Sequence, residues 1–240
     1  MNEGSPPQQV SIIGAGVIGA AWAARWLLRG SDVSVYDPSP ETERMVTEVL
    51  ENARYAWQRL DTAPESEGSL SFSKSLEDAI DGAQLIQEST PEDLDFKKSI
   101  FAQIESCVDN TVIIASSTSG LLPSALQDEM ANPDRLVVGH PFNPVYLIPM
   151  VEVVGGKQTS DGSISTAISF YEAAGMNPLH VRVEIDAFIA DRLLEAVWRE
   201  ALWLVKDGVA TTQEIDDVIR LGFGLRWAQM GLFENYRIAG

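Results

Sequence analysis

Residues 10–37 of this 240-residue chain read VSIIGAGVIGAAWAARWLLRGSDVSVYD, and they decide its fold class. The apolar run 10–13 is typical of a short buried strand, and it ends in a glycine-rich turn. From Val17 apolar residues recur at helical spacing until Gly30, which ends the helix. Residues 33–36 form a second apolar run. The stretch therefore predicts a strand, a tight turn, a helix and a second strand.

The turn carries the pattern G-x-G-x-x-G, and an acid, Asp37, ends the next strand. In such a turn the first glycine permits the bend, the second lets the backbone approach a pyrophosphate, and the third lets the helix pack close to the strand. The N–H groups and dipole of the helix then face the phosphates. A simple turn with a capping acid explains less of this context. The predicted dinucleotide-binding residues are Gly14, Ala15, Gly16, Val17, Ile18, Gly19 and Asp37.

Asp37 is predicted to select the cofactor. Its carboxylate is expected to bind the adenosine ribose hydroxyls and to repel the 2′-phosphate of NADP. No basic residue lies in 37–43 to offset that repulsion. We therefore expect NAD.

Strand and helix patterns alternate along the first 185 residues. Further strands are predicted at 70–72, 83–87, 112–116, 136–139, 151–154 and 179–183. Helices are predicted from Pro40 toward Asp61 and at 76–81, 94–107 and 163–174. This alternation favours an α/β, Rossmann-type fold with a mostly parallel sheet and helices on both faces.

From Asp186 the pattern is helical only, so we expect an NAD-binding domain over 1–185 and an all-α domain over 186–240. Thr211 with Glu214 forms a capping-box pattern that opens one helix. The second domain offers two helices and the start of a third, too little to close its own core. Either the chain is a fragment of a longer protein, or this domain completes its core against a second subunit.

Composition excludes several classes of partner. The chain holds 17 Lys+Arg against 35 Asp+Glu, a formal net charge of -18, which repels nucleic acid and anionic membranes. Its apolar stretch 10–24 follows an acidic leader and is broken by glycines, so neither a signal peptide nor a membrane span is expected. Cys107 is the single cysteine, so no intrachain disulfide can form, and we expect a cytoplasmic protein.

His140 is the stronger of two histidine candidates for chemistry. It opens the loop 141–144 at the end of a predicted strand, where α/β sheets place their ligands. Glu152 lies among apolar residues and needs a buried partner, and a His–Glu pair supplies one together with a general base. Spacing alone leaves a structural ion pair as an equal alternative. His180 is expected to be a polar residue on a sheet face.

Other chemistries have weaker support. The hydroxyl cluster 116–120 follows a predicted strand, but such clusters are usually turn and cap residues. A Ser-His-Asp hydrolase is disfavoured because no G-x-S-x-G elbow surrounds these serines, and the two histidines and one cysteine show no metal-ligand spacing. Trp198, Trp203 and Trp227 are interpreted as core or interface residues rather than as an aromatic cage for a cation.

Five longer stretches resemble the 3-hydroxyacyl-CoA dehydrogenase family, and within it the branch that acts on carnitine. They are residues 16–30 (GVIGAAWAARWLLRG), 116–124 (SSTSGLLPS), 139–156 (GHPFNPVYLIPMVEVVGG), 184–208 (EIDAFIADRLLEAVWREALWLVKDG) and 221–231 (LGFGLRWAQMG). The resemblance extends over nearly the whole chain. It implies an NAD-dependent dehydrogenase that acts on a CH–OH group.

The resemblance also implies roles for particular residues. The family's catalytic serine falls on Ser119, and its His–Glu pair falls on His140 and Glu152. The implied further cofactor contacts are Glu92, Lys97 and Asn143. The resemblance implies, too, that the helical domain continues beyond Gly240 and forms a homodimer.

One departure from the family concerns the substrate. Where acyl-CoA members carry an asparagine, this chain has Asp191, and segment 41–81 holds ten acids against four basic residues although CoA phosphates need cations. A small substrate with a quaternary ammonium fits better, because an acid and aromatic rings offset its charge. The residues expected at the substrate are Ser119, Phe142, Asp191, Phe223 and Trp227. An alternative pairs Asp191 with Arg192 or another basic residue.

We therefore expect oxidation of the 3-hydroxyl of L-carnitine to 3-dehydrocarnitine, with His140 as base, Glu152 as its partner and NAD as hydride acceptor. Alternatives in the same class are 3-hydroxyacyl-CoA and gulonate-type 3-hydroxy acid dehydrogenases. A non-catalytic NAD-binding or structural protein is a third alternative. The joint presence of Ser119, His140 and Glu152 disfavours it.

Overall fold

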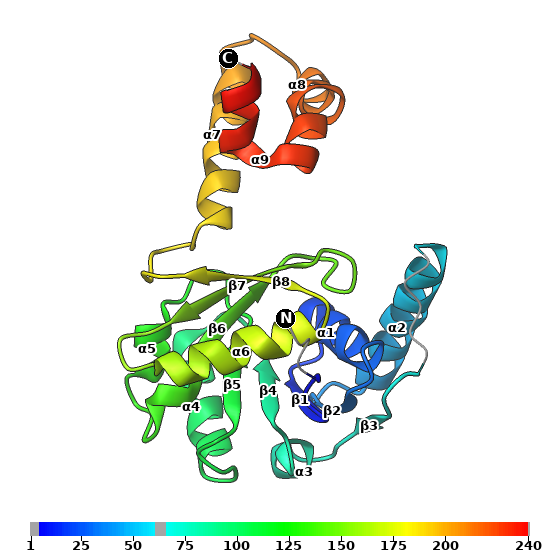
Figure 1. Ribbon diagram of the computed structural model, residues 1–240, viewed down its shortest axis with the longest axis vertical. Helices are drawn as coiled ribbons and strands as arrows, with labels where there is room; N and C mark the ends of the chain where they lie inside the picture. The colour runs from blue at the N-terminus through cyan, green and yellow to red at the C-terminus, as the bar shows by residue number, and fades with distance from the viewer. Residues whose placement is uncertain (1–4, 61–65, 240) are drawn as a thin grey trace. The chain divides into compact units, whose positions relative to one another are not determined.

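The computed structural model describes residues 5–60 and 66–239. The chain divides into two compact units, Met1–Phe188 and Ile189–Gly240. The first alternates strands and helices, whereas the second consists of helices (Figure 1). The predicted fold class, a Rossmann-type α/β unit followed by an all-α unit, is confirmed.

The strands of the first unit form one sheet in the order β3-β2-β1-β4-β5-β6-β7-β8. Their bounds are β1 (Gln9–Ile13), β2 (Asp32–Tyr36), β3 (Leu70–Phe72), β4 (Leu85–Glu88), β5 (Ile113–Ser116), β6 (Leu136–Pro141), β7 (Met150–Gly155) and β8 (Asn177–Val181). Neighbours pair in parallel except β6 and β7, which run antiparallel. Since β1, β4, β5 and β6 are parallel neighbours, their carboxyl ends lie along one edge of the sheet.

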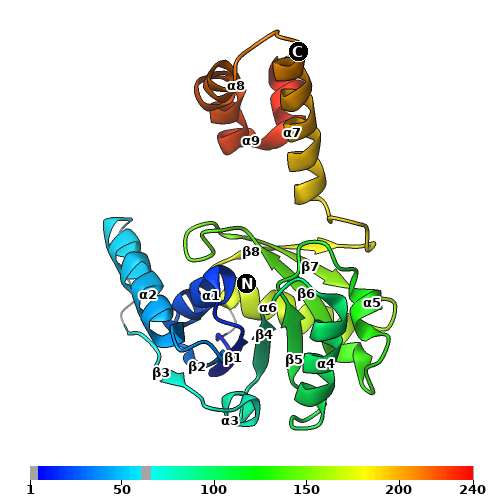
Figure 2. The same ribbon diagram turned by 180° about the vertical axis from the view of Figure 1, so that it is seen from behind.

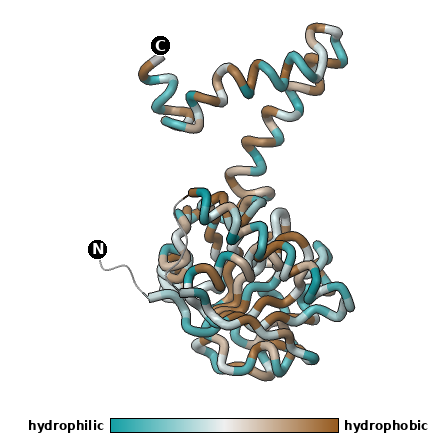
Figure 3. Tube along the Cα trace, turned by 90° about the vertical axis from the view of Figure 1, so that its right-hand side faces the viewer, coloured by the Kyte–Doolittle hydropathy of each residue, from teal (hydrophilic) through white to brown (hydrophobic). Residues whose placement is uncertain are grey.

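Helices cover both faces of this sheet (Figures 1 and 2). One face carries α1 (Val17–Leu27), α2 (Thr42–Arg59) and α6 (Asp161–Ala173). The other carries α3 (Leu76–Ile80), α4 (Leu94–Glu105) and α5 (Pro123–Gln127), with a 3-10 turn at Pro133–Arg135. Each face buries its own apolar core, and Figure 3 shows hydrophobic segments gathered in the interior of this unit.

An aromatic cluster joins α1 and α6 over the sheet. Trp22 and Trp26 have ring centroids 6.1 Å apart, and the Tyr171 ring lies 5.3 Å from that of Trp22. The Tyr171 hydroxyl donates to Gln87 Oε1 at 2.7 Å, and burial raises the pKa of this phenol. Because the rings are fully buried and the hydroxyl is satisfied, the cluster fixes α1 on the sheet. The glycine turn that begins α1 therefore has a rigid base.

The second unit contains α7 (Ala190–Lys206), α8 (Thr212–Val218), a π-helical turn (Ile219–Phe223) and α9 (Gly224–Ala239). The predicted capping box at the start of α8 is confirmed. The Thr211 side chain accepts a hydrogen bond from the Glu214 N–H, and the Glu214 carboxylate accepts one from the Thr211 N–H. α7 and α8 bury none of their residues, although α7 is amphipathic. Trp198 is 60% exposed. These helices thus leave apolar side chains uncovered.

Three details differ from the sequence-based expectation. The strand expected at 179–183 is β8, which lies two residues earlier; as the edge of the sheet it tolerates Pro178, whose missing N–H would interrupt an inner strand. The helix expected from Pro40 toward Asp61 is α2, which starts at Thr42, and Asp61 lies outside the described residues. The helix α5 was not predicted, because five residues are too few to show a helical period.

Candidate active site

The glycine turn follows β1 at the carboxyl edge of the sheet, and each glycine has its own reason to be there. Gly14 has φ +86°, and a Cβ on it would lie 2.6 Å from the Ser89 carbonyl oxygen at the end of β4. A Cβ on Gly19 would lie 1.8 Å from the Gly14 carbonyl oxygen, so only glycine lets α1 pack this closely. A Cβ on Gly16 would meet nothing within 4 Å. Gly16 therefore borders open space rather than protein.

The start of α1 is suited to an anion. Its N-cap is Gly16, which offers no side-chain cap, and its first turn contains no acid. The first N–H groups of a helix need acceptors, and with the helix dipole they favour a phosphate. The open space at Gly16 and the uncapped N–H groups together fit the pyrophosphate of a dinucleotide.

Asp37 lies beside this turn. Its Oδ2 accepts the Ala15 N–H at 2.7 Å, and its Oδ1 accepts the Ser39 N–H at 2.8 Å. Since each carboxylate oxygen has a second lone pair, these bonds hold the carboxylate in place and leave it able to accept ribose hydroxyls. The predicted cofactor residues Gly14, Ala15, Gly16 and Asp37 are thus brought together at one edge.

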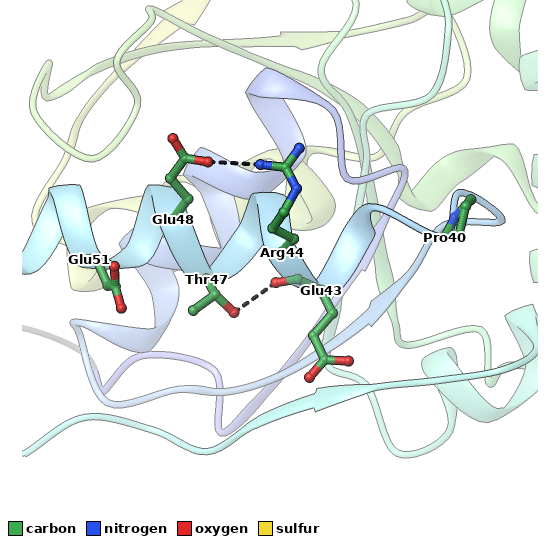
Figure 4. A pocket seen from close by; sticks show the side chains of 6 residues that line it. All are labelled: Pro40, Glu43, Arg44, Thr47, Glu48 and Glu51. Carbon is green, nitrogen blue, oxygen red and sulfur yellow. Dashed lines mark hydrogen bonds and ion pairs between the residues drawn. The ribbon is translucent and has the colours of Figure 1, made fainter.

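The first basic residue after Asp37 is Arg44 on α2. Its Nε lies 2.8 Å from Glu41 Oε2 and its Nη1 lies 3.1 Å from Glu48 Oε2, and the Glu41 hydrogen bond raises the pKa of Arg44. Arg44 lines a surface pocket with Pro40, Glu43, Thr47, Glu48 and Glu51 (Figure 4). Carboxylates outnumber the single arginine there, so this surface disfavours the extra phosphate of NADP.

His140 and Glu152 form a buried pair across the antiparallel β6 and β7. The two residues are directly opposite each other, and His140 Nδ1 lies 2.9 Å from Glu152 Oε2. Glu152 is 0% exposed and His140 is 6% exposed. A buried carboxylate needs such a partner, and it fixes which ring nitrogen carries the proton. His140 lies near the carboxyl end of β6, at the same edge as the glycine turn.

Two aromatic rings pack against His140. The Phe142 centroid lies 5.3 Å from the imidazole centroid, and the Phe188 centroid lies 5.7 Å from it. Phe188 is fully buried, whereas Phe142 is partly exposed. The proximity of Phe188 could not be inferred from the sequence, since it comes from the far end of the first unit. Asn143 follows in the loop, exposed, with a cis peptide bond to Pro144.

The loop after β5 presents Ser119 and is organised by Glu92. Glu92 Oε1 accepts the Thr118 hydroxyl and the N–H groups of Ser119 and Gly120, the last two at 3.2 Å. Glu92 is therefore a scaffold for the Ser119 loop as well as a residue at the cofactor edge. Ser119 itself is exposed.

Lys97 is buried beneath this loop. Its Nζ donates to Glu88 Oε1 at 2.6 Å and lies 3.7 Å from Glu92 Oε2, and its side chain is 1% exposed. The Ser116 hydroxyl donates to the other Glu88 oxygen at 2.6 Å. Glu88 is a functional residue that the sequence-based prediction does not include, although a lone acid that ends a buried strand is the same signal that indicates a partner for Glu152. Glu88 therefore joins the end of β4 to α4 through Lys97 and to the end of β5 through Ser116.

The remaining predicted substrate residues belong to the second unit. Asp191 lies in the first turn of α7, where an acid is favoured by the helix dipole. The Phe223 and Trp227 rings have centroids 4.6 Å apart.

Within the described ranges no cluster of His, Cys, Asp or Glu could hold a metal ion. No helix of the residues that the structure describes is long and apolar enough to cross a bilayer.

The fold and the glycine turn define a Rossmann-type dinucleotide-binding protein. Residues 9–185 match the NAD binding domain of 3-hydroxyacyl-CoA dehydrogenase, and residues 188–240 match its C-terminal domain. The chain belongs to the 3-hydroxyacyl-CoA dehydrogenase family and carries its NAD-binding domain.

Named relatives fall in the same family. The chain is 56% identical to the L-carnitine dehydrogenase/betainyl-CoA thioesterase of Agrobacterium fabrum over 97% of its own length and 47% of the relative. It is 53% identical to the L-carnitine dehydrogenase of Mesorhizobium japonicum, over 97% of its own length and 64% of the relative. The chain thus spans between about half and two thirds of these relatives.

A crystal structure with the same fold is that of 5-formyl-3-hydroxy-2-methylpyridine 4-carboxylic acid 5-dehydrogenase, an NAD+ dependent dismutase. It is 31% identical to this chain, with a TM-score of 0.92, and the match covers 97% of this chain and 76% of that one.

Proposed function

We propose that the protein oxidises the 3-hydroxyl of L-carnitine to 3-dehydrocarnitine with NAD. The observation that carries the proposal is the buried His140–Glu152 pair, which lies at the same edge of the sheet as the glycine turn. Two relatives more than half identical to the chain bear the name L-carnitine dehydrogenase, and this supports the choice of substrate.

His140 acts as the general base. With Nδ1–H donating to Glu152, the basic lone pair of the neutral ring lies on Nε2, which takes the proton of the substrate hydroxyl. The Glu152 carboxylate then faces the imidazolium and stabilises its charge. As the O–H bond breaks, the oxygen forms the carbonyl and C3 loses its hydrogen with the electron pair. NAD, when bound, supplies the acceptor for that hydride.

Ser119 hydrogen-bonds the reacting oxygen of the substrate in this proposal. Its backbone N–H is held by Glu92, and Lys97 lies against the same carboxylate. An ordered loop supports this role, because a hydrogen-bond donor contributes to catalysis when its position is fixed beforehand. Glu92, Lys97 and Asn143 also contribute to the cofactor site.

We propose substrate-binding roles for Phe142 in the first unit and for Asp191, Phe223 and Trp227 in the second, because a carboxylate and aromatic rings offset the charge of a quaternary ammonium. A cation over an aromatic ring gains about 0.5–2 kcal/mol. The acidic character of the chain supports a cationic substrate over a CoA ester, whose phosphates it repels.

We further infer a cytoplasmic homodimer formed through the helical unit. Its large exposed apolar side chains support this, since Trp198 is 60% exposed and Leu194 is 59% exposed. The cofactor-binding role of 1–185 and the substrate and dimerisation role of 186–240 belong to the same proposal.

The experiment compares three substrates side by side in the full-length protein with NAD: L-carnitine, a gulonate-type sugar acid and a 3-hydroxyacyl-CoA. The proposal predicts the highest kcat/KM for L-carnitine. A higher kcat/KM for the sugar acid or the 3-hydroxyacyl-CoA would show that the proposed substrate is wrong and that the protein is still a dehydrogenase. NAD binding without turnover of any of the three would favour the non-catalytic alternative.

A further inference from the structure

The last residues of the first unit, 184–188, end in Phe188, whose ring lies against the proposed catalytic base. Phe188 is 0% exposed, and its ring is tilted by 50° to the imidazole of His140. Phe142, also tilted, lies against the same imidazole. We refer to residues 184–188 as the exit segment, because the chain leaves the first unit there.

The exit segment is anchored at its start. Glu184 Oε2 accepts the Ser124 N–H at 3.0 Å, and Glu184 Oε1 accepts the Ser124 hydroxyl. Ser124 lies in the first turn of α5, whose N-cap, Leu122, provides no side-chain acceptor. The carboxylate therefore caps α5 and ties the exit segment to the helix that follows the Ser119 loop.

The end of the exit segment is strained. Ala187 has φ +59° and Phe188 has φ +46°, both in the left-handed region that side-chain-bearing residues rarely adopt. Such a conformation persists only where surrounding contacts hold it, and it is found preferentially at functional sites. The contacts here are the Phe188 N–H to the Ile185 carbonyl, at 3.2 Å, and the complete burial of the Phe188 ring beside His140.

A ring packed in this way supplies what the carboxylate alone does not. The hydrogen bond from Nδ1 to Glu152 sets the position of one ring nitrogen, whereas packing on the ring faces restricts the rotation of the imidazole about its bond to Cβ. Apolar contacts on the imidazole fix its plane and therefore the direction of Nε2. Proton transfer depends steeply on this direction.

We propose that Phe188 is a positioning residue for His140, held in place by the anchored and strained exit segment. The inference rests on the proposed function in that it takes His140 to be the base. It assigns Phe188 no contact with the substrate or the reacting atoms.

The test uses Phe188→Leu in the full-length protein, which keeps apolar bulk and removes the ring. The matched control is Phe101→Leu, since Phe101 is equally buried, belongs to the same apolar core and lies on α4. We expect both variants to lower Tm by similar amounts and to keep the KM for NAD. Phe188→Leu alone should lower kcat by about tenfold or more.

A second readout is independent of turnover. In protein labelled with ¹³C-histidine, the His140 ring signals are those lost in His140→Gln, and His180, exposed on β8, is an internal reference. Phe188→Leu should shift the His140 signals and leave those of His180 unchanged. Glu184→Gln, which weakens the anchor and keeps the ring, should give a smaller change of the same kind.

The proposal is overturned if the kcat of Phe188→Leu stays within about twofold of the Phe101→Leu control, or if its His140 signals do not move. If the wild-type protein does not oxidise L-carnitine, the proposed function fails. The NMR comparison then decides the positioning of His140 by itself.

Discussion

His140 and Glu152 act as one unit, because the carboxylate both orients the imidazole and stabilises the charge that the imidazole acquires. We expect His140→Ala to lower kcat by roughly 10²–10⁴ with NAD affinity nearly unchanged. Glu152→Gln keeps the shape and removes the charge, so its loss should be smaller. The double variant should lose less than the two single losses combined. Steady-state kinetics and NAD titration measure these terms, and additive losses would make Glu152 a purely structural residue.

At Asp37, cofactor choice depends on one carboxylate. Its oxygens are already fixed by the Ala15 and Ser39 N–H groups, so it cannot move away from an added 2′-phosphate without losing both bonds. Like charges in contact cost several kcal/mol, so we expect kcat/KM for NAD to exceed that for NADP by at least about 10²-fold. Asp37→Ser should lower the ratio of kcat/KM for NAD to kcat/KM for NADP. Equal turnover of the wild type with both cofactors would contradict this account.

The glycine turn offers a test at the scale of one element, in which neighbouring glycines have opposite consequences. In Gly19→Ala the new Cβ meets the Gly14 carbonyl, so we expect a loss of about 1–3 kcal/mol or more in the free energy of unfolding. In Gly16→Ala the Cβ meets no protein atom, so the loss should be limited to that of a poorer N-cap residue, about 1 kcal/mol or less.

The affinity for NAD should be the property that Gly16→Ala changes most. Gly16→Ala places a methyl group where a pyrophosphate would approach, so the folded variant should bind NAD about tenfold more weakly or worse. Thermal denaturation and calorimetric titration of both variants measure the two effects. If Gly16→Ala bound NAD as tightly as the wild type, the proposal that the pyrophosphate binds at this turn would be wrong.

The elements also show what a sequence can predict. Buried strands such as β1 and β6 contain short, mainly apolar runs, so the sequence predicts them directly, as it does the amphipathic α7. The edge strand β8 begins two residues before the predicted 179–183, and its bounds are hard to predict because few of its residues are buried and its alternation is weak. The helix α5 is too short to have a period.

Within the site, local patterns were predictable and contacts between distant segments were not. The glycine turn and Asp37 carry a known spacing, and the isolation of Glu152 among apolar residues pointed to a partner. The pairing of Glu88 with Lys97, the Glu92 bonds to the Ser119 loop and the packing of Phe188 on His140 depend on strand order and loop conformation. These arrangements follow only when the sheet has been assembled.

At the scale of the whole molecule, charge separates the candidate substrates. A formal net charge of -18 disfavours a polyanionic CoA ester and is compatible with a small substrate that carries a quaternary ammonium. The second unit contributes Asp191 to this proposal. A substrate cation removed from water requires such a carboxylate or aromatic rings.

Asp191→Asn tests that contribution with little change in volume. We expect a marked rise in the KM for L-carnitine and little change in the KM for NAD, because only the substrate cation loses its counter-charge. Arg192→Gln is the control for the alternative in which Asp191 pairs with its neighbour. An unaltered carnitine KM in Asp191→Asn would rule out the cation role.

The most direct measurement for the central claim is NADH formation by the purified full-length protein given L-carnitine and NAD, with acetoacetyl-CoA reduction by NADH as the parallel assay. The account predicts steady NADH formation with L-carnitine, little turnover of acetoacetyl-CoA, and loss of the carnitine signal in His140→Ala. Efficient reduction of acetoacetyl-CoA with no NADH formed from L-carnitine would contradict it.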